Sequence, residues 1–489
     1  MEVPAAVERL QASIVDGRTG SIRYRQDQLQ ALHTGLREES DNICSALLAD
    51  TSLPGAEVEV EYYLAVDAVR HFYDSLDFEG ELKAEYNVVY GKDNLLRRVG
   101  VGLVVIRPTG HTRFYSIVTP LAAAIAAGNT IILELPNTVR QVDSVLRALL
   151  TKVLDASTFY ISQSDTERSI LDEAVVVDQT GTETSTTLKS PLLSPAMARC
   201  VAIVDRSARI DEAAKAITAA RFSFGGSSPY APDLVLVNEF VKKEFYEACS
   251  RYATLAFAKG SSVKAASSKQ SEEIRKDIED AERKRQVSSF GSADFRLVDI
   301  LDRSSPIKGL KVTGRYLLIA TTSSLTDAIY NQGLESPLLA GYFFAEPSSA
   351  KYLAQFLPCR ISLINQIPVH LLVGPAAPEA HDPDFHYRYS TDMFSVPRPQ
   401  FVEKPPIAFQ KAEELLLGSS KAVTTSTLRE AAVKPLPPKN QSDNKAIGFF
   451  EQGFLTGAGV ILTLVLPAVG YSTFLLGRKG LEFTRNLRG

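Results

Sequence analysis

The chain has 489 residues, of which 45% are hydrophobic and 22% charged, with a net charge of −4. This composition is typical of a globular protein and excludes a mainly disordered chain, and the charge gives no basis for a nucleic-acid partner. Four widely spaced cysteines without a CxxC pair, and six dispersed histidines without an HExxH motif, exclude a disulfide framework and argue against a metal site. We expect a reducing compartment.

The first predicted elements are helices between residues 22 and 78. Apolar side chains recur there at helical spacing, with charged residues on the other face. The apolar positions of the first stretch are Leu29, Leu32, Leu36, Ile43 and Leu47. The segment before them is amphipathic and lacks the uncharged apolar centre of a signal peptide.

From residue 99 onward the pattern alternates between short β-branched runs and helical stretches. The predicted strands are VGVGLVVIRP (99–108), TIILELP (130–136), EAVVVDQ (173–179), CVAIVD (200–205) and LVLVNEF (234–240). The predicted helices lie at 117–129, 142–154, 210–222 and 241–257. Continuous apolar strands separated by helices predict parallel sheets with crossover helices, an α/β fold.

Residues 259–295 are polar and lysine-rich, and we expect them to form solvated surface. Two further strands are predicted at 316–322 and 339–345.

The end of the chain has a different character. A proline-rich linker (433–446) precedes a run from Gln452 to Gly477 that contains no charged residue, and a basic tail follows. About 20 apolar residues suffice to cross a bilayer as a helix. Pro467 and the glycines are compatible with this because kinks and small residues are tolerated in lipid. The run predicts a transmembrane anchor.

Several ordered blocks resemble the aldehyde dehydrogenase superfamily. They include RRVGVGLVVIRPTG, PLAAAIAAGNTIILELP, ARCVAIVDRSARIDEAAKAITAARF, GSSPYAPDLVLVNEF and CRISLINQIPVH, and the resemblance covers roughly residues 5–405. The chain looks similar to the membrane-anchored fatty-aldehyde dehydrogenase-like branch, of fungal type. The resemblance implies a Rossmann-like cofactor domain, a catalytic α/β domain and an oligomerisation arm, in a homodimer.

The resemblance also implies a chemistry that the chain does not supply. In the family a cysteine thiolate attacks the aldehyde, hydride passes to nicotinamide, and a glutamate activates water. The cysteine stands just before an Ala-Pro-Asp block, and here Pro229 occupies its place in GSSPYAPD. Proline offers no nucleophile and also removes a backbone N–H.

Other family positions differ too. The general-base glutamate's position lies near Pro195, with no acid between Glu183 and Asp205. Glu134 or Leu135 stands where a lysine grips the ribose of the cofactor. The phosphate turn survives only as Thr180-Gly181, without the second glycine, and the turn RPTGHTRFYS lacks the oxyanion asparagine. The later glutamate that holds the nicotinamide ribose is absent from KVTGRYLLIA.

Weak candidates for a replacement chemistry are His111, near the expected substrate funnel with Arg113, and also Ser228 and Tyr230. Ser227 or Ser228 could replace the thiol only with an adjacent base, which the sequence does not name. The family-like residues Asn365, His370, His386 and Arg398 have a structural interpretation, as does Cys249 on a packed helix.

The sequence therefore favours a membrane-anchored, aldehyde dehydrogenase-like protein that has lost thiol-based, NAD(P)-dependent oxidation. It would act as a pseudoenzyme or an auxiliary ligand-binding protein, for instance in fungal specialised-metabolite biosynthesis. One alternative is a repurposed pocket that catalyses a non-redox step such as cyclisation, isomerisation or hydration, with Tyr115 as a further candidate. A second alternative is a genuine dehydrogenase of an apolar aldehyde.

We expect no cofactor, or NAD or NADP where activity is retained. Expected partners are a membrane, an apolar small molecule or pathway enzymes, and a second copy of the chain. A tail anchor would leave the main domain in the cytoplasm, with the endoplasmic reticulum as the favoured membrane. The expected domains are a Rossmann-like domain (1–195), a catalytic-type domain (196–370), an arm (371–430), a linker (431–451), the anchor (452–477) and a basic tail (478–489).

Overall fold

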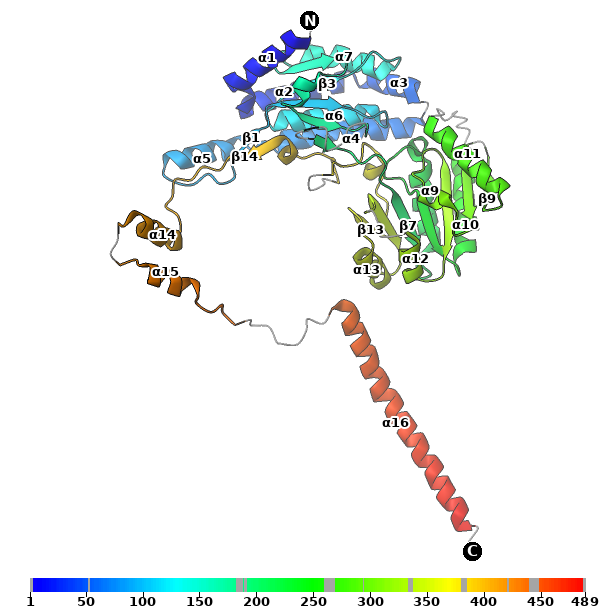
Figure 1. Cartoon of the computed structure of the whole chain (residues 1–489). Helices are drawn as coiled ribbons and strands as arrows, with labels where there is room; N and C mark the ends of the chain where they lie inside the picture. Colours follow the sequence, from blue (N-terminus) through cyan, green and yellow to red (C-terminus); the bar gives the residue numbers. More distant parts are fainter. Residues whose placement is uncertain are drawn as a thin grey trace. The chain divides into compact units, whose positions relative to one another are not determined.

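A computed structural model gives the fold of this protein (Figure 1). It describes residues 3–51, 53–181, 188, 191–258, 269–292, 294–332, 337–379, 385–419, 422–438 and 448–486. The chain divides into two compact units, Met1–Glu403 and Lys404–Gly489.

A five-stranded parallel sheet forms the first part of unit 1. Its spatial order is β4 (Phe159–Ser162), β3 (Thr130–Glu134), β2 (Leu103–Arg107), β5 (Val175–Asp178) and β6 (Pro191–Leu193). Counted along the chain, the strands run third, second, first, fourth, fifth, which is the doubly wound, Rossmann-like order. The order reverses between β2 and β5, where such sheets open a crevice at their carboxyl edge.

Both faces of this sheet are buried, as the uninterrupted β-branched runs predict. Alternate side chains of β2 divide between the faces: Leu103 and Val105 pack with α1, whereas Val104 and Ile106 pack with the larger helical layer. The helices of this part are α1 (Val3–Asp16), α2 (Ile22–Glu38), α3 (Ser40–Thr51), α4 (Gly55–Asp74), α5 (Phe78–Val89), α6 (Arg113–Ala126), α7 (Gln141–Val153) and α8 (Arg168–Leu171). Every residue of α6 is buried, because this helix lies inside the layer.

A seven-stranded sheet forms the second part. Its order is β13 (Ser362–Ile364), β12 (Ala340–Phe344), β7 (Cys200–Val204), β8 (Leu234–Asn238), β11 (Tyr316–Thr322), β10 (Arg296–Ile300) and β9 (Val287–Gly291). All pairs are parallel except β9 with β10. Two helices, α9 (Ile210–Phe222) and α10 (Lys242–Ala258), pack on one face. The other face is covered by α11 (Lys269–Arg283), α12 (Leu325–Gln332) and α13 (Pro347–Phe356).

The expectation of a purely solvated surface for 259–295 was wrong for its described part. Helix α11 and strand β9 lie there, and Ile274, Ile278 and Ala281 are buried against the sheet. Most residues of α11 are charged and only a few are apolar, so the helical spacing of the apolar residues was not recognised in the sequence.

Short elements complete unit 1. They are η1 (Arg18–Gly20), η2 (Ser223–Gly226), η3 (Pro306–Gly309), η4 (Val369–Leu372), η5 (Thr391–Phe394), β1 (Arg98–Gly100) and β14 (Ser395–Pro397). β14 returns from the far end of the unit and pairs antiparallel with β1, beside which it lies in Figure 1. The Phe394 carbonyl accepts from Asn129 Nδ2 at 3.0 Å, and Phe394 is buried in the core of the first part.

Unit 2 contains α14 (Ile407–Leu417), α15 (Thr425–Ala432) and α16 (Phe449–Asn486). The uncharged run 452–477 lies within α16. Among the helices of the described residues, a search on length and hydropathy finds none able to span a membrane.

Candidate functional site

A cleft of about 830 Å³ lies between the two sheets of unit 1. One wall is the carboxyl edge of the five-stranded sheet, with the turns after β2 and after β5. The other wall is the amino edge of the seven-stranded sheet, with the turns before β8 and before β11. The lining includes His111, Thr180, Ser227, Pro229 and Arg315. The first wall is the switch point of the Rossmann-like sheet, the usual place for a ligand in such folds.

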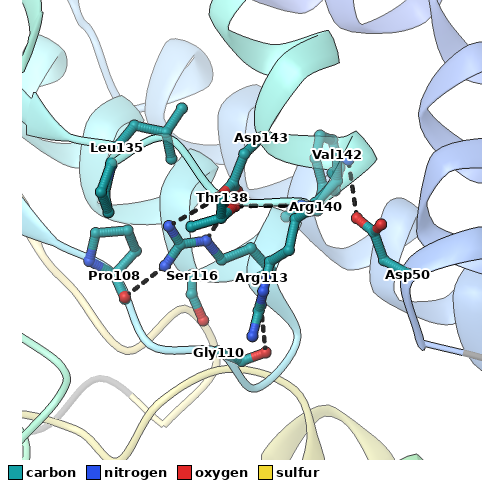
Figure 2. Close-up of polar contacts among 12 residues, drawn as sticks. Asp50, Pro108, Gly110, Arg113, Ser116, Leu135, Thr138, Arg140, Val142 and Asp143 are labelled. Carbon is teal, nitrogen blue, oxygen red and sulfur yellow. Dashed lines mark hydrogen bonds and ion pairs between the residues drawn. The ribbon is translucent and has the colours of Figure 1, made fainter. Parts of the chain in front are cut away.

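The turn after β2 is held by a buried ion pair (Figure 2). Arg113 Nε donates to Asp143 Oδ1 at 2.9 Å, with only 9% and 1% of the two side chains exposed. Arg113 Nη1 also donates to the Pro108 carbonyl at 2.6 Å, and Thr138 Oγ1 donates to Asp143 Oδ2 at 3.0 Å. Each charge is therefore satisfied by its partner and by further hydrogen bonds, as buried charges require.

Two more contacts fix the same turn. Arg140 Nη1 donates to the Gly110 carbonyl at 3.2 Å, and Asp50 Oδ2 accepts from Val142 N at 2.9 Å, at the start of α7. A carboxylate at a helix N-terminus meets unsatisfied N–H groups and the positive end of the helix dipole. The turn that carries His111 is thus rigid.

The turn before β8 has an unusual backbone. Phe224, Gly225 and Gly226 have φ angles of 50°, 66° and 70°, all in the left-handed region. Buried Arg221 donates to the carbonyls of Gly226 and Gly314, and Glu57 Oε2 accepts from Phe224 N at 2.8 Å. A Cβ on Gly226 would lie 2.2 Å from the Gly314 carbonyl oxygen, so only glycine fits.

The two turns meet at His111 and Ser227. His111 Nδ1 lies 2.9 Å from Ser227 Oγ, and His111 Nε2 lies 2.8 Å from the Leu372 carbonyl. Burial lowers the pKa of His111 to about 4, so the imidazole is neutral at pH 7. Ser227 is exposed to the cleft.

Comparisons with known proteins agree with this architecture. The family model "Aldehyde dehydrogenase family" matches residues 1–161. The rat "Aldehyde dehydrogenase, dimeric NADP-preferring" is 22% identical over 408 residues, which cover 75% of this chain and 86% of the rat protein. The 4,4'-diaponeurosporen-aldehyde dehydrogenase of Staphylococcus aureus is 23% identical over 415 residues, or 77% and 89% of the two chains.

Solved structures give the same result for the fold. The substrate-bound Staphylococcus aureus AldH superposes with a TM-score of 0.66 at 20% identity, covering 83% of this chain and 95% of that one. The Methanocaldococcus jannaschii GapN complexed with NADP gives 0.63 at 15% identity, covering 81% and 93%. The chain therefore has the fold of aldehyde dehydrogenases, and its sequence is similar to theirs over about three quarters of its length.

The superfamily's nucleophile position, as the sequence resemblance assigns it, holds Pro229 at the cleft wall. The Pro229 carbonyl accepts from Lys311 Nζ at 2.7 Å and from the Cys200 thiol at 3.3 Å. Pro195 adjoins the cleft-lining residues Ser194 and Ala196, and its carbonyl accepts from Ala198 N. Pro229 thus lines the cleft and Pro195 adjoins it, and neither side chain can act as a nucleophile or an acid.

None of the four cysteines is among the described residues that line the cleft. Burial raises the pKa of Cys200 and of Cys249 to about 12, and those of Cys44 and Cys359 to about 11. These thiols remain protonated at pH 7 and are poor nucleophiles.

Two sequence candidates have structural contacts instead. Ser228 is 2% exposed, and its Oγ accepts from Tyr230 N at 3.3 Å. Tyr230 is fully buried, accepts from Ala377 N at 3.1 Å, and lies under the guanidinium of Arg388. Tyr115 is likewise buried in the core.

The residues that match the family near the arm also have structural contacts. Asn365, with a φ of 55°, exchanges hydrogen bonds with the backbone of Ala345 in both directions. His370 stacks on His386 with ring centroids 5.3 Å apart. Arg398 N donates to the Arg97 carbonyl at 2.8 Å.

The described residues at the cofactor edge do not provide the expected ribose contacts. Glu134 is buried, pairs with Arg107 at 2.6 Å and accepts from Thr166 N, and Leu135 is fully buried. Thr180 hydrogen-bonds to Asp178 Oδ1 through both its N–H and its hydroxyl. Residues 182–187 of the phosphate turn lie outside the described residues, as does the linker 439–447.

A search of the described residues finds no cluster of three or more His, Cys, Asp or Glu side chains that could hold a metal ion.

Arg315 is the cleft residue that sequence reasoning missed. It is only 7% exposed, and its Nε and Nη1 have no hydrogen-bond partner among the described residues. Its guanidinium lies 4.9 Å from the ring centroid of Phe257. Burial lowers the pKa of Arg315 against the opposing field of Glu57. The only sequence signal was a basic residue directly before a buried strand.

Proposed function

We propose that the cleft binds an aldehyde or a related carbonyl compound, the ligand class that the superfamily's name implies. The observation that supports this best is the position of the cavity, at the switch point of the Rossmann-like sheet and against the second sheet. Its lining combines apolar side chains such as Phe224, Met197 and Val312 with convergent polar groups, as small-molecule sites do.

Oxidation of that aldehyde is the candidate that the relatives favour. The curated relatives named above are dehydrogenases, one of them NADP-preferring, and their similarity extends over three quarters of this chain. On these names, NAD or NADP is the proposed cofactor. The comparisons back this candidate better than the pseudoenzyme that the sequence first favoured.

Binding without thiol-based oxidation is the second candidate, and one specific observation favours it. Pro229 stands at the nucleophile's assigned position, and the four thiols are protonated and away from the cleft lining. Without a thiolate, the covalent step of the superfamily mechanism has no nucleophile.

One experiment separates these candidates. The purified chain is titrated with NAD and NADP, and then incubated with decanal while reduced cofactor is followed by absorbance. Aldehyde-dependent reduction establishes the dehydrogenase. Decanal binding by calorimetry with no reduction, in a preparation that retains its fold by circular dichroism, establishes the binding protein.

A third candidate is a repurposed pocket that catalyses a non-redox reaction, and His111 is its remaining catalytic candidate. Tyr115 and Tyr230 are buried, and Ser228 has a structural contact. Turnover of a carbonyl compound without cofactor, reduced in His111→Ala, would support this alternative.

We also propose that 452–477 anchors the chain as a single-pass tail, with the main domain in the cytoplasm and the endoplasmic reticulum as the membrane. The run is uncharged, and α16 exposes apolar side chains such as Leu455, Ile461 and Leu464. A chain that ends at Leu436 should move to the soluble fraction, and its continued sedimentation with membranes would contradict the anchor.

A homodimer is proposed because a similar protein is named as dimeric. Light scattering of unit 1 in detergent-free buffer would test it, since a monomer at micromolar concentration contradicts it. Membership of the fungal, membrane-anchored branch and a role beside pathway enzymes remain further proposals, which metabolite profiling of a deletion strain would test.

A further inference from the structure

The pairing of His111 with Ser227 provides chemistry that neither the thiol mechanism nor simple binding uses. The two residues are 116 positions apart, yet Nδ1 and Oγ lie 2.9 Å from each other on the cleft wall. A hydroxyl within hydrogen-bond reach of an imidazole, itself oriented by a third group, is the arrangement of an activated nucleophile. We propose that Ser227 and His111 form the nucleophile and general base of a site that hydrolyses esters or thioesters.

The tautomer of His111 follows from its second contact. The Leu372 carbonyl can only accept, so Nε2 carries the proton and Nδ1 presents its lone pair to Ser227. The carbonyl thereby fixes the ring as the third member of a catalytic triad does, although it carries no charge to stabilise an imidazolium. The ring of Phe224 meets the imidazole edge-on, with centroids 6.2 Å apart, and limits its rotation.

Ser227 occupies a position suited to attack. It is exposed to the cleft directly after three residues in left-handed conformation, and Thr112, directly after His111, has a φ of 40°. A backbone held in such sparsely populated regions on both sides of one contact costs energy and is typical of functional sites. Ser227 Oγ also lies 2.8 Å from the Phe224 carbonyl, so its proton has two acceptors at rest.

One backbone donor of this turn remains for the oxyanion. Ser227 N donates to the Phe224 carbonyl at 3.3 Å, and Pro229 has no N–H. Within 227–229 this leaves the N–H of Ser228, the residue after the nucleophile. A donor at that place stabilises negative charge as it develops on the attacked carbonyl oxygen.

Arg315 indicates the class of substrate. Gly314 N donates to the Gly226 carbonyl at 3.0 Å. Arg315 directly follows Gly314 and Ser227 directly follows Gly226, so this hydrogen bond brings the backbones of Arg315 and Ser227 close together. The Nε and Nη1 of Arg315 are buried without a partner in the described structure, and the residue lines the same cleft. Glu57 and Asp294 oppose this charge through space but form no ion pair with it in the described structure, and a buried guanidinium without such a pair is costly unless an anion completes it. The substrate should therefore carry a carboxylate or phosphate group.

The reaction balances with water alone. Ser227 Oγ forms a bond to the ester carbonyl carbon while its proton moves to His111 Nδ1. The bond from that carbon to the leaving oxygen or sulfur breaks, and the leaving group takes the proton from His111. Water, deprotonated by His111, then cleaves the acyl-serine to release the acid and restore both residues. No oxidant or cofactor takes part.

The test uses the full chain in detergent without NAD or NADP. The wild type is treated with a fluorophosphonate, and hydrolysis of the anionic ester p-nitrophenyl hemisuccinate is measured separately. We expect the label on the peptide that contains Ser227. Ser227→Ala should hydrolyse the ester no faster than buffer, and His111→Gln should be about 100-fold slower than wild type. Ser304→Ala is the matched control, because Ser304 is exposed, bonds only to Asp302 and lies outside the cleft lining.

Substitutions of Arg315 test the predicted substrate class independently of Ser227 and His111. Arg315→Leu should raise the KM for the hemisuccinate at least about tenfold and leave the KM for neutral p-nitrophenyl acetate unchanged, whereas Arg315→Lys should restore part of the preference. Label on another residue, or hydrolysis by Ser227→Ala at the wild-type rate, would overturn the proposal. Because the labelling is done on the wild type, a misfolded variant cannot decide the outcome. Absent aldehyde oxidation would leave this result intact, so the two proposals fail separately.

Discussion

The two walls of the cleft differ in how their polar groups are satisfied. On the five-stranded wall, charged side chains meet in closed pairs, Arg113 with Asp143 and Arg107 with Glu134. The seven-stranded wall also has a closed pair, Lys311 with Asp233, but beside it Arg315 has unsatisfied nitrogens, Ser227 faces the cleft, and the turn at 224–226 is left-handed. Closed pairs make a rigid frame, whereas unsatisfied and strained groups persist where a ligand completes them. The closed pairs of the five-stranded wall therefore hold the turn that carries His111 in place opposite Ser227 on the seven-stranded wall.

The largest effect should come from opening a pair on the first wall. Asp143→Ala leaves the Arg113 charge buried alone, and we expect a loss of about 3–5 kcal/mol in the free energy of unfolding of unit 1. Urea denaturation measures it. The exposed pair Arg168–Asp172 is the control, since Asp172→Ala should cost under about 1 kcal/mol. Equal losses of stability in Asp143→Ala and Asp172→Ala would contradict the burial of the Arg113–Asp143 pair.

The strained turn on the second wall offers a matched glycine pair. Both Gly225 and Gly226 have positive φ, but only Gly226 lacks space for a Cβ, whereas Gly225 faces open space. Gly225→Ala should cost about 1 kcal/mol for the backbone conformation alone. Gly226→Ala should cost at least about 2 kcal/mol more, because the clash with the Gly314 carbonyl moves backbone. Thermal unfolding of the two variants compares them, and similar midpoints would mean that the turn relaxes freely.

The contact between the walls predicts a pH dependence. The pKa of His111 is about 4 in the folded chain and near 6.5 when unfolded, so the unfolded chain binds more protons between these values. Stability contributed by neutral His111 is complete above about pH 6.5 and falls as the pH decreases to 4, by about 3 kcal/mol in total. His111→Gln should flatten this part of the stability curve. An unchanged slope in the variant would mean that His111 titrates normally.

The smallest effect is expected at Arg315. Arg315→Met removes a buried, incompletely paired charge and keeps the packing on Phe257, so stability should stay equal or rise by about 1 kcal/mol. Arg221→Met is the contrasting variant, because Arg221 is fully buried and donates to three carbonyls. A loss at Arg315 as large as at Arg221 would show that Arg315 holds the fold rather than a ligand.

Much of the fold could be predicted from the sequence because buried parallel strands are locally encoded. The runs at 103–107, 130–134, 200–204 and 234–238 are continuous and apolar, and all became strands. Strand β9 was missed because VSSFG is mostly polar and lies at the sheet edge, where one neighbour suffices. The aldehyde dehydrogenase fold was also predictable, because sequence blocks that resemble that family occur in order along most of unit 1.

The site was only partly predictable. His111 and Ser227 were each noted, but their contact depends on two turns 116 residues apart, and no local pattern reveals it. Arg315 gave no signal because the absence of a partner is a property of packing and not of spacing. Ser228 and Tyr230 were attractive by type, yet the hydrogen bonds that occupy them are tertiary.

The return of β14 to β1 has a consequence for synthesis of the chain. Val101 N donates to the Phe394 carbonyl and β1 pairs with β14, so this two-stranded sheet is completed by residues almost 300 positions downstream. At ~5–20 residues per second, roughly 15–60 seconds of translation separate the two partners. During that interval the nascent first domain exposes the apolar surface that Tyr389, Met393 and Phe394 later cover. The early domain should therefore depend on chaperones on the ribosome until its last strand arrives.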